Sequence, residues 1–232
     1  MIFFDIDETL FDNTSAQNFA ALKLYNEFQD LHVIYEESAF PQKWNEVTEK
    51  YVQLFLANKI SFQQQRRNRL REIFRKDFTD SEADEMFTIY LRFYEENWRL
   101  FDDVIPCLNK LRPRKLGIIS NGDKYQQRQK LRDLKIIERF EVIVISDDIG
   151  ISKPNPEIFW HGCKKANESL AKCYYIGDDL HTDAKAASEA GLKGIWLNRE
   201  QEKRKDEAII EVSALYQLAN VIQSYRDRDA HR

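Results

Sequence analysis

The sequence predicts an α/β protein in which a parallel sheet has helices on both faces and an all-α domain of about four helices is inserted. In the second half of the chain, short apolar runs alternate with helix-like stretches, a pattern typical of a parallel sheet covered on both sides. A long segment with helical periodicity separates the first apolar run from the second. The chain has only 7 Gly and 5 Pro in 232 residues, few of the turn residues that an all-β protein needs.

The composition indicates a globular protein and argues against several classes of partner. Hydrophobic residues make up 43% of the chain and aromatic residues 12%, which is too apolar for a disordered segment. The formal net charge of −4 removes the usual electrostatic reason to expect a nucleic acid or an anionic membrane as partner. The chain has no signal-peptide pattern at its start and no apolar run near the roughly 20 residues of a membrane span. We therefore expect a cytoplasmic protein, a monomer or a weak homodimer, without membrane or nucleic-acid partners.

Five apolar runs of strand length mark the expected sheet. They cover residues 2–4, 115–120, 141–146, 173–177 and 194–197, which are too short for buried helices. Helices are expected between them at about residues 124–134, 156–166 and 183–190. Pro156 suits the first turn of the second helix, because the N–H that proline lacks has no partner there. Gly191 is suited to end the third helix.

The segment between the first two strands is the inserted domain. It is roughly 80 residues longer than a βαβ unit of about 30 residues requires. Apolar side chains recur in it at helical spacing, in stripes at residues 21–28, 47–55 and 87–98. We expect the helical insertion to span residues 15–100, and the core to comprise residues 1–14 and 101–232.

Within the insertion, polar residues mark helix starts and aromatic residues mark the buried face. Ser61 is suited to cap one helix, and Thr79 or Ser81 to cap the next. The aromatic stripes favour core packing, although Trp44 is also able to stack on a base or a sugar.

Two acidic residues directly follow the first expected strand. The side chains of Asp5 and Asp7 point to the same side of an extended chain, because positions i and i+2 share a face. Carboxylates this close repel each other unless a cation lies between them. A divalent ion that prefers oxygen ligands, Mg²⁺ above all, would remove that repulsion.

Polar residues also follow later strands. Ser120 ends one strand and Asn121 opens the next helix, where a hydroxyl and free backbone N–H groups can bind a phosphate. Lys153 lies between a strand and a proline-constrained helix start, a position from which its charge can neutralise an anion.

Three acidic residues, Asp178, Asp179 and Asp183, follow the strand at residues 173–177. In an open parallel sheet, ligands bind outside the carboxyl ends of the strands. We therefore expect these four polar groups to converge at this edge of the sheet. The alternative, that they are four unrelated loops placed there by chance, is improbable.

These four groups resemble, in order and spacing, the four motifs of the haloacid dehalogenase-like (HAD) hydrolase superfamily. The matching segments are FFDIDETLF at residues 3–11, IISNG at 118–122, SKP at 152–154 and IGDDLHTD at 176–183. The resemblance covers essentially the whole chain and implies a Rossmann-like core, with the insertion as what the family calls a C1 helical cap. Within the family, the chain is most similar to small-molecule phosphatases of the 5'-nucleotidase and N-acylneuraminate-9-phosphatase kind.

The resemblance implies Mg²⁺-dependent hydrolysis of a small-molecule phosphate monoester, a nucleotide or a sugar phosphate, through an aspartyl-phosphate. Asp5 would attack phosphorus, and Asp7 would act first as general acid and then as general base. Mg²⁺ would be held by Asp5, by the backbone carbonyl of Asp7 and by Asp178.

Further site residues are implied in the same way. The phosphoryl oxygens would be bound by Ser120, Asn121 and Lys153. Asp183 and Asp179 would orient Lys153 or metal-bound water without contacting the substrate or the metal themselves.

Two alternatives stay open beside phosphatase activity. True haloacid dehalogenases lack an acid at the position of Asp7, because a halide leaving group needs no proton, so Asp7 favours phosphoryl chemistry. A phosphomutase of the β-phosphoglucomutase kind keeps both acids and is compatible with the sequence. A catalytically idle binding protein is disfavoured, because a competent residue occupies every catalytic position.

Overall fold

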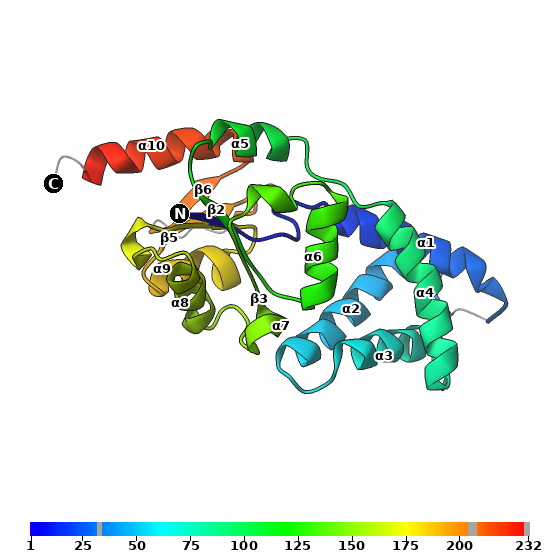
Figure 1. Ribbon diagram of the computed structural model, residues 1–232. Helices are drawn as coiled ribbons and strands as arrows, with labels where there is room; N and C mark the ends of the chain where they lie inside the picture. Colours follow the sequence, from blue (N-terminus) through cyan, green and yellow to red (C-terminus); the bar gives the residue numbers. More distant parts are fainter. Residues whose placement is uncertain (32–33, 204–207, 230–232) are drawn as a thin grey trace. The chain divides into compact units, whose positions relative to one another are not determined.

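The computed structural model describes residues 1–31, 34–203 and 208–229 (Figure 1). The chain divides into two compact units, one comprising Met1–Phe11 and Leu100–Arg232 and the other comprising Asp12–Arg99. At the boundary, Phe11 and Leu100 form an antiparallel bridge, so the chain leaves and rejoins the first unit at neighbouring points. Within the described ranges, we find no helix with the length and hydropathy that crossing a bilayer requires.

The first unit is built on a sheet that has six strands in the described residues, in the order β3-β2-β1-β4-β5-β6, with every neighbouring pair parallel. The strands are β1 (Ile2–Phe4), β2 (Leu116–Ser120), β3 (Val142–Ile145), β4 (Tyr174–Gly177), β5 (Lys193–Leu197) and β6 (Ile210–Val212). The predicted α/β class is confirmed, and the first five strands end within one residue of the predicted limits. The sequence did not predict β6, because it is short and the middle one of its three residues is exposed.

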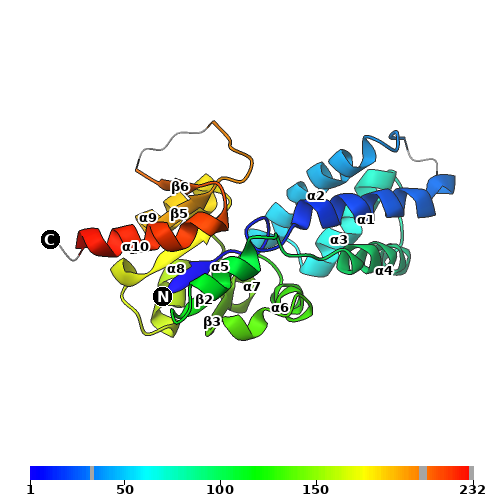
Figure 2. The ribbon, with the colours of Figure 1, turned by 90° about the horizontal axis from the view of Figure 1, so that it is seen from above.

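Helices cover both faces of this sheet. Figure 1 and Figure 2 show α5 (Val104–Lys110) and α10 (Leu218–Asp229) on one side, and α8 (Pro156–Lys165) and α9 (Ala186–Glu189) on the other. Phe3, Ile119 and Tyr175, from the three central strands, are buried in one apolar cluster with residues of α8 and α9. This packing fixes the central strands, and with them the residues that follow their carboxyl ends.

The first unit has six further helical segments in its described residues. They are α6 (Lys124–Asp133), α7 (Ser146–Ile149), η2 (Ile137–Arg139), η3 (Leu170–Lys172), η4 (Leu180–Lys185) and η5 (Leu215–Gln217). Asp123 caps α6 and Asp179 caps η4, each by accepting from the backbone N–H groups two and three residues further on. The helix predicted at residues 183–190 therefore begins earlier, at Leu180, and its first part is a π-helical turn, a form that is frequent at functional sites.

The second unit contains four helices in its described residues, α1 (Asn13–Glu27), α2 (Phe40–Leu56), α3 (Phe62–Phe74) and α4 (Asp80–Glu96), with the short turn η1 (Gln29–Leu31) after α1. Ser61 caps α3, and Thr79 caps α4 in a capping box with Glu82. Trp44 is fully buried, with its ring centroid 4.6 Å from that of Tyr90. Of the two interpretations of Trp44, core packing is therefore the one that the structure supports.

Candidate active site

Loops at the carboxyl edge of the central strands bring the sequence-predicted polar residues together. Strand β1 pairs with both β2 and β4, so the residues at the ends of these three strands lie level with one another. Asp5 follows β1, Ser120 ends β2 and Asp178 follows β4. Lys153 reaches the same place from the loop between α7 and α8, where its ammonium group contacts Asp5.

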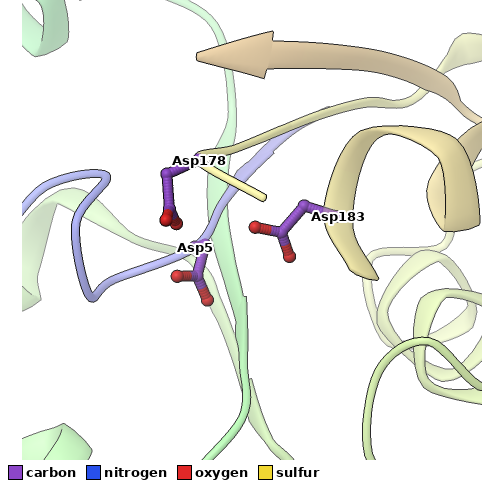
Figure 3. Close-up of side chains that lie close together, drawn as sticks. All are labelled: Asp5, Asp178 and Asp183. Atoms are coloured by element: carbon purple, nitrogen blue, oxygen red, sulfur yellow. The ribbon is translucent and has the colours of Figure 1, made fainter. Parts of the chain in front are cut away.

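Three carboxylates form an acidic cluster (Figure 3). Asp5, Asp178 and Asp183 each offer a carboxylate oxygen, and these oxygens lie within 4.8 Å of one another. Figure 3 shows the carboxylates of Asp178 and Asp183 pointing toward Asp5 from the segment after β4. Asp5 and Asp183 are buried, whereas Asp178 is half-buried.

Lys153 joins this cluster through its ammonium group. Its Nζ donates to Asp5 Oδ1 at 2.6 Å, to Asp183 Oδ1 at 2.6 Å and to the Tyr175 hydroxyl at 2.8 Å. The three N–H groups of the ammonium thus each have an acceptor, and the side chain is only 4% exposed. One buried positive charge faces several carboxylates, so the site carries excess negative charge.

Tyr175 also belongs to the candidate site, although the sequence did not predict it, because it lies within an apolar strand and no motif marks it. Its hydroxyl accepts from Lys153 and donates to the carbonyl oxygen of Ile119 in β2 at 2.8 Å. The ring is fully buried and packs edge-on against Phe159 of α8, with centroids 5.0 Å apart. Tyr175 therefore anchors the ammonium group of Lys153 to the sheet.

Burial and neighbouring charges shift the pKa values of Asp5, Asp178 and Lys153. Burial raises the pKa of the Asp5 carboxyl to about 6, in opposition to the nearby charge of Lys153. Burial also raises the pKa of Asp178 well above its usual range, and the charges of Asp183 and Asp5 add to the effect. Burial by itself lowers the pKa of the Lys153 ammonium, but the charges of Asp183 and Asp5 outweigh it, and this pKa lies well above its ordinary value. A further cation would therefore be favoured here.

Asp183 reaches Lys153 across the end of β4 because Gly177 has no side chain. A Cβ atom on Gly177 would collide with the Asp183 carboxylate. The backbone N–H of Asp179 donates to Asp183 Oδ2 at 3.2 Å, and the Asp179 carboxylate itself serves as the cap of η4. Asp183 is thereby held in place on both of its oxygens.

The carboxylate of Asp7 is held by two side chains of α6. Asp7 Oδ1 accepts from Lys130 Nζ at 2.6 Å, and Asp7 Oδ2 accepts from Gln127 Nε2 at 2.9 Å. Both α6 residues are buried. The sequence reading missed both, since they lie in a polar helix without a motif of their own.

Ser120 and Asn121 connect the end of β2 to its neighbours. Ser120 Oγ accepts from Gln127 Nε2 at 3.1 Å. Asn121 Nδ2 donates to the Lys153 carbonyl oxygen at 3.1 Å, and Asn121 Oδ1 accepts from the Lys153 backbone N–H at 2.8 Å. These reciprocal bonds join the loop that carries Ser120 to the loop that carries Lys153.

The donor set fits a hard divalent cation such as Mg²⁺. Asp5, Asp178 and Asp183 offer only carboxylate oxygens, the ligand type that Mg²⁺ prefers. Asp178 is preorganised for a cation by two hydrogen bonds. Thr9 Oγ1 donates to its Oδ1 at 3.3 Å, and Trp196 Nε1 donates to its carbonyl oxygen at 2.7 Å. A cation among these oxygens would also offset the repulsion between the three carboxylates.

Comparisons with known proteins agree with this geometry. A family model described as haloacid dehalogenase-like hydrolase matches residues 1–191. The chain is 28% identical over 210 residues to the N-acylneuraminate-9-phosphatase of Mus musculus, which covers 85% of this chain and 82% of that protein. It is 26% identical over 226 residues to the pyrimidine 5'-nucleotidase YjjG of Escherichia coli, with 95% and 96% covered. The structure of the HAD-hydrolase YfnB of Bacillus subtilis, bound to magnesium and said to reveal interdomain movement, matches with a TM-score of 0.77 at 23% identity, covering 96% of this chain and 97% of that chain.

An acidic cluster and a buried lysine thus lie at the carboxyl edge of a parallel sheet, which defines an α/β protein with a candidate cation-binding site. With the family model matching most of its length, the chain belongs to the haloacid dehalogenase-like hydrolase family. The resemblance inferred from the four sequence motifs is thus confirmed, as is the expectation of a HAD-like enzyme whose relatives are named as phosphatases and nucleotidases. The likeness to YfnB shows the shared fold.

Proposed function

We propose that this chain is a Mg²⁺-dependent phosphatase that cleaves small-molecule phosphate monoesters through an aspartyl-phosphate on Asp5. The observation that carries the proposal is the environment of Asp5. Its buried carboxylate is bonded to Lys153 on one oxygen and is grouped with Asp178 and Asp183. A phosphoryl group at this position would meet a nucleophile, an ammonium group and the carboxylates suited to a metal ion.

In the proposed reaction, one carboxylate oxygen of Asp5 attacks phosphorus while the bond to the leaving oxygen breaks. Lys153, the Ser120 hydroxyl and the backbone N–H of Asn121 bind the phosphoryl oxygens, and fixed donors of this kind contribute a factor of about 10² to 10³ each. When bound, Mg²⁺ supplies the positive charge that lets two anions, the carboxylate and the phosphate, come into contact.

The metal ion would be held by Asp5, by the backbone carbonyl of Asp7 and by Asp178. Asp183 would orient Lys153, as its 2.6 Å contact with the ammonium group suggests. Asp179 would support the same arrangement indirectly, since its backbone N–H donates to Asp183.

Asp7 would transfer protons. Its carboxyl group would give a proton to the leaving oxygen, and the carboxylate would then take a proton from the water that hydrolyses the aspartyl-phosphate. The Asp7 side chain is 31% exposed, so it is accessible to a leaving group and to water.

The helical insertion, proposed at residues 15–100, would act as a cap that excludes water and contacts the leaving group. The magnesium-bound relative YfnB, said to reveal interdomain movement, supports a movable cap. The relatives named above, a pyrimidine 5'-nucleotidase and an N-acylneuraminate-9-phosphatase, support a nucleotide or a sugar phosphate as substrate.

The test is hydrolysis of p-nitrophenyl phosphate and of a panel of nucleoside monophosphates and sugar phosphates. We expect release of inorganic phosphate with Mg²⁺ and none with EDTA. Asp5→Asn is expected to lower kcat by roughly 10³-fold or more, because the amide is not a nucleophile. Asp133→Asn, which changes an exposed aspartate at the end of α6, is the matched control and is expected to keep full activity.

Two results would contradict the proposal. Substantial activity in Asp5→Asn would exclude an aspartyl-phosphate on Asp5. A phosphate that moves within a sugar phosphate without being released would identify the phosphomutase alternative instead.

A further inference from the structure

Helix α6 presents two buried side chains to Asp7, and the mechanism above gives neither of them a role. Gln127 and Lys130 are three residues apart, so they share one face of α6. Each contacts one oxygen of the Asp7 carboxylate. Since buried polar side chains need partners, the burial of this pair depends in part on Asp7.

The orientation of the Gln127 amide follows from its neighbours. Nε2 lies 2.9 Å from Asp7 Oδ2, 3.0 Å from the Asn121 carbonyl oxygen and 3.1 Å from Ser120 Oγ. Rotation of the amide by half a turn would set its oxygen against the carboxylate and the carbonyl, so the nitrogen must face them. Two N–H groups are thus shared among three acceptors. Gln127 connects Asp7 to Ser120 through a single nitrogen atom.

Gly122 provides the space that Gln127 occupies. A Cβ atom on Gly122 would lie 3.2 to 3.3 Å from the Gln127 side chain, which is tighter than ordinary packing, and the residue has a φ of +134°. Asp123 then caps α6. The loop after β2 therefore helps to set the position from which the Gln127 side chain contacts Asp7.

Lys130 places a charge on the other oxygen of Asp7. Its Nζ is 2.6 Å from Asp7 Oδ1, and its side chain is 4% exposed, whereas that of Asp7 is 31% exposed. With a donor on each oxygen, the plane of the Asp7 carboxylate is fixed. Each oxygen keeps a second lone pair, which is free to meet a ligand from the exposed side.

We propose that Gln127 and Lys130 are positioning residues that hold the Asp7 carboxyl group in the orientation needed for proton transfer to the leaving group. This assignment rests on the proposed phosphatase function. The Asp7 carboxyl gives its proton to the ester oxygen as the P–O bond breaks, and the carboxylate recovers a proton from water when the aspartyl-phosphate is hydrolysed. Orientation matters most for an alkoxide, which leaves only with a proton.

The test compares two kinds of leaving group in Gln127→Leu and Lys130→Met, which keep the size of each side chain and remove its donors. p-Nitrophenolate leaves without a proton, whereas the alkoxide of a nucleoside monophosphate or sugar phosphate needs one. We expect kcat/KM for the best alkyl ester of the wild type to fall about 10- to 100-fold in each variant. For p-nitrophenyl phosphate, kcat/KM is expected to stay within about threefold. Gln129→Leu, at a partly exposed position of the same helix, is expected to change neither value.

The ratio of the two kcat/KM values does not depend on the folded fraction, so a variant that folds poorly still gives an answer. Asp7→Asn is expected to show the same selective loss to a greater degree. Equal losses on both esters, or no loss on either, would overturn the assignment of Gln127 and Lys130. A wild-type protein that hydrolyses neither ester would instead refute the proposed phosphatase function. An unchanged ratio in active variants would refute only the assignment of Gln127 and Lys130.

Discussion

Replacing Tyr175 with phenylalanine is expected to destabilise the sheet unit by about 2 to 4.5 kcal/mol, because the change removes the hydrogen bonds of a buried hydroxyl and keeps the ring. The hydroxyl accepts from Lys153 Nζ at 2.8 Å and donates to the Ile119 carbonyl oxygen at 2.8 Å, with Asp183 Oδ1 as a second, longer acceptor at 3.3 Å. The ring stays in place against Phe159. Tyr175 is fully buried, so bulk water does not reach the position of the missing hydroxyl.

The magnitude follows from the two short hydrogen bonds of this hydroxyl. A hydrogen bond from the charged Lys153 contributes about 1.5 to 3 kcal/mol, and one to a neutral carbonyl contributes about 0.5 to 1.5 kcal/mol. Lys153 keeps Asp5 and Asp183 as partners, so the larger cost of an unpaired buried charge does not arise. In a protein of this size the loss corresponds to a fall in Tm on the order of 10 °C.

Differential scanning calorimetry and urea unfolding measure this change. Tyr125→Phe makes the same chemical substitution at a side chain that is 73% exposed, and it is expected to alter the free energy of unfolding by less than about 0.5 kcal/mol. A loss below about 1 kcal/mol in Tyr175→Phe would refute the role of this hydroxyl as the anchor of Lys153.

Three further predictions concern the position of Asp183, the role of Asp178 and the cap of α4. Gly177→Ala is expected to cost about 1 to 3 kcal/mol and to lower activity, because the new methyl group displaces the Asp183 carboxylate; unchanged activity and Tm would contradict this. Asp178→Asn is expected to be at least as stable as the wild type without metal, because burial already raises the pKa of Asp178 well above its usual range. The rise in Tm that Mg²⁺ produces in the wild type should be lost in this variant, and an equal rise in both proteins would count against Asp178 as a ligand. Thr79→Ala is expected to cost about 1 kcal/mol by breaking the capping box with Glu82, and calorimetry that finds no change would argue against that cap.

The sheet and its acidic edge could be predicted because burial on both faces makes each central strand a short apolar run. Asp5, Ser120 and Asp178 stand at the ends of such runs, and parallel strands place their carboxyl ends at one edge. Lys153 could be added because a proline-rich segment fixes the loop that carries it. Chain order and strand polarity were sufficient for Asp5, Ser120 and Asp178, whereas Lys153 also needed the two prolines beside it.

Other parts of the site depend on contacts that the sequence does not express. In the sequence, Tyr175 is one residue of an apolar strand, and nothing there shows that its hydroxyl has partners. Only its hydrogen bonds to Lys153 and Ile119 in the structure identify it. Gln127 and Lys130 lie in a polar helix and are buried beside a carboxylate that is 120 and 123 positions away. Strand β6 was missed for a related reason, since an edge strand with an exposed central residue lacks the apolar run that marks the others.

The bridge between Phe11 and Leu100 also matters for protein engineering. The backbone N–H of Phe101 donates to the Leu10 carbonyl oxygen at 3.2 Å beside this bridge, so the two ends of the sheet unit already meet there. Deleting residues 12–99 and closing the break with a tight turn would leave every strand of the sheet uninterrupted. The same junction offers a site for grafting a foreign helical module onto the sheet unit.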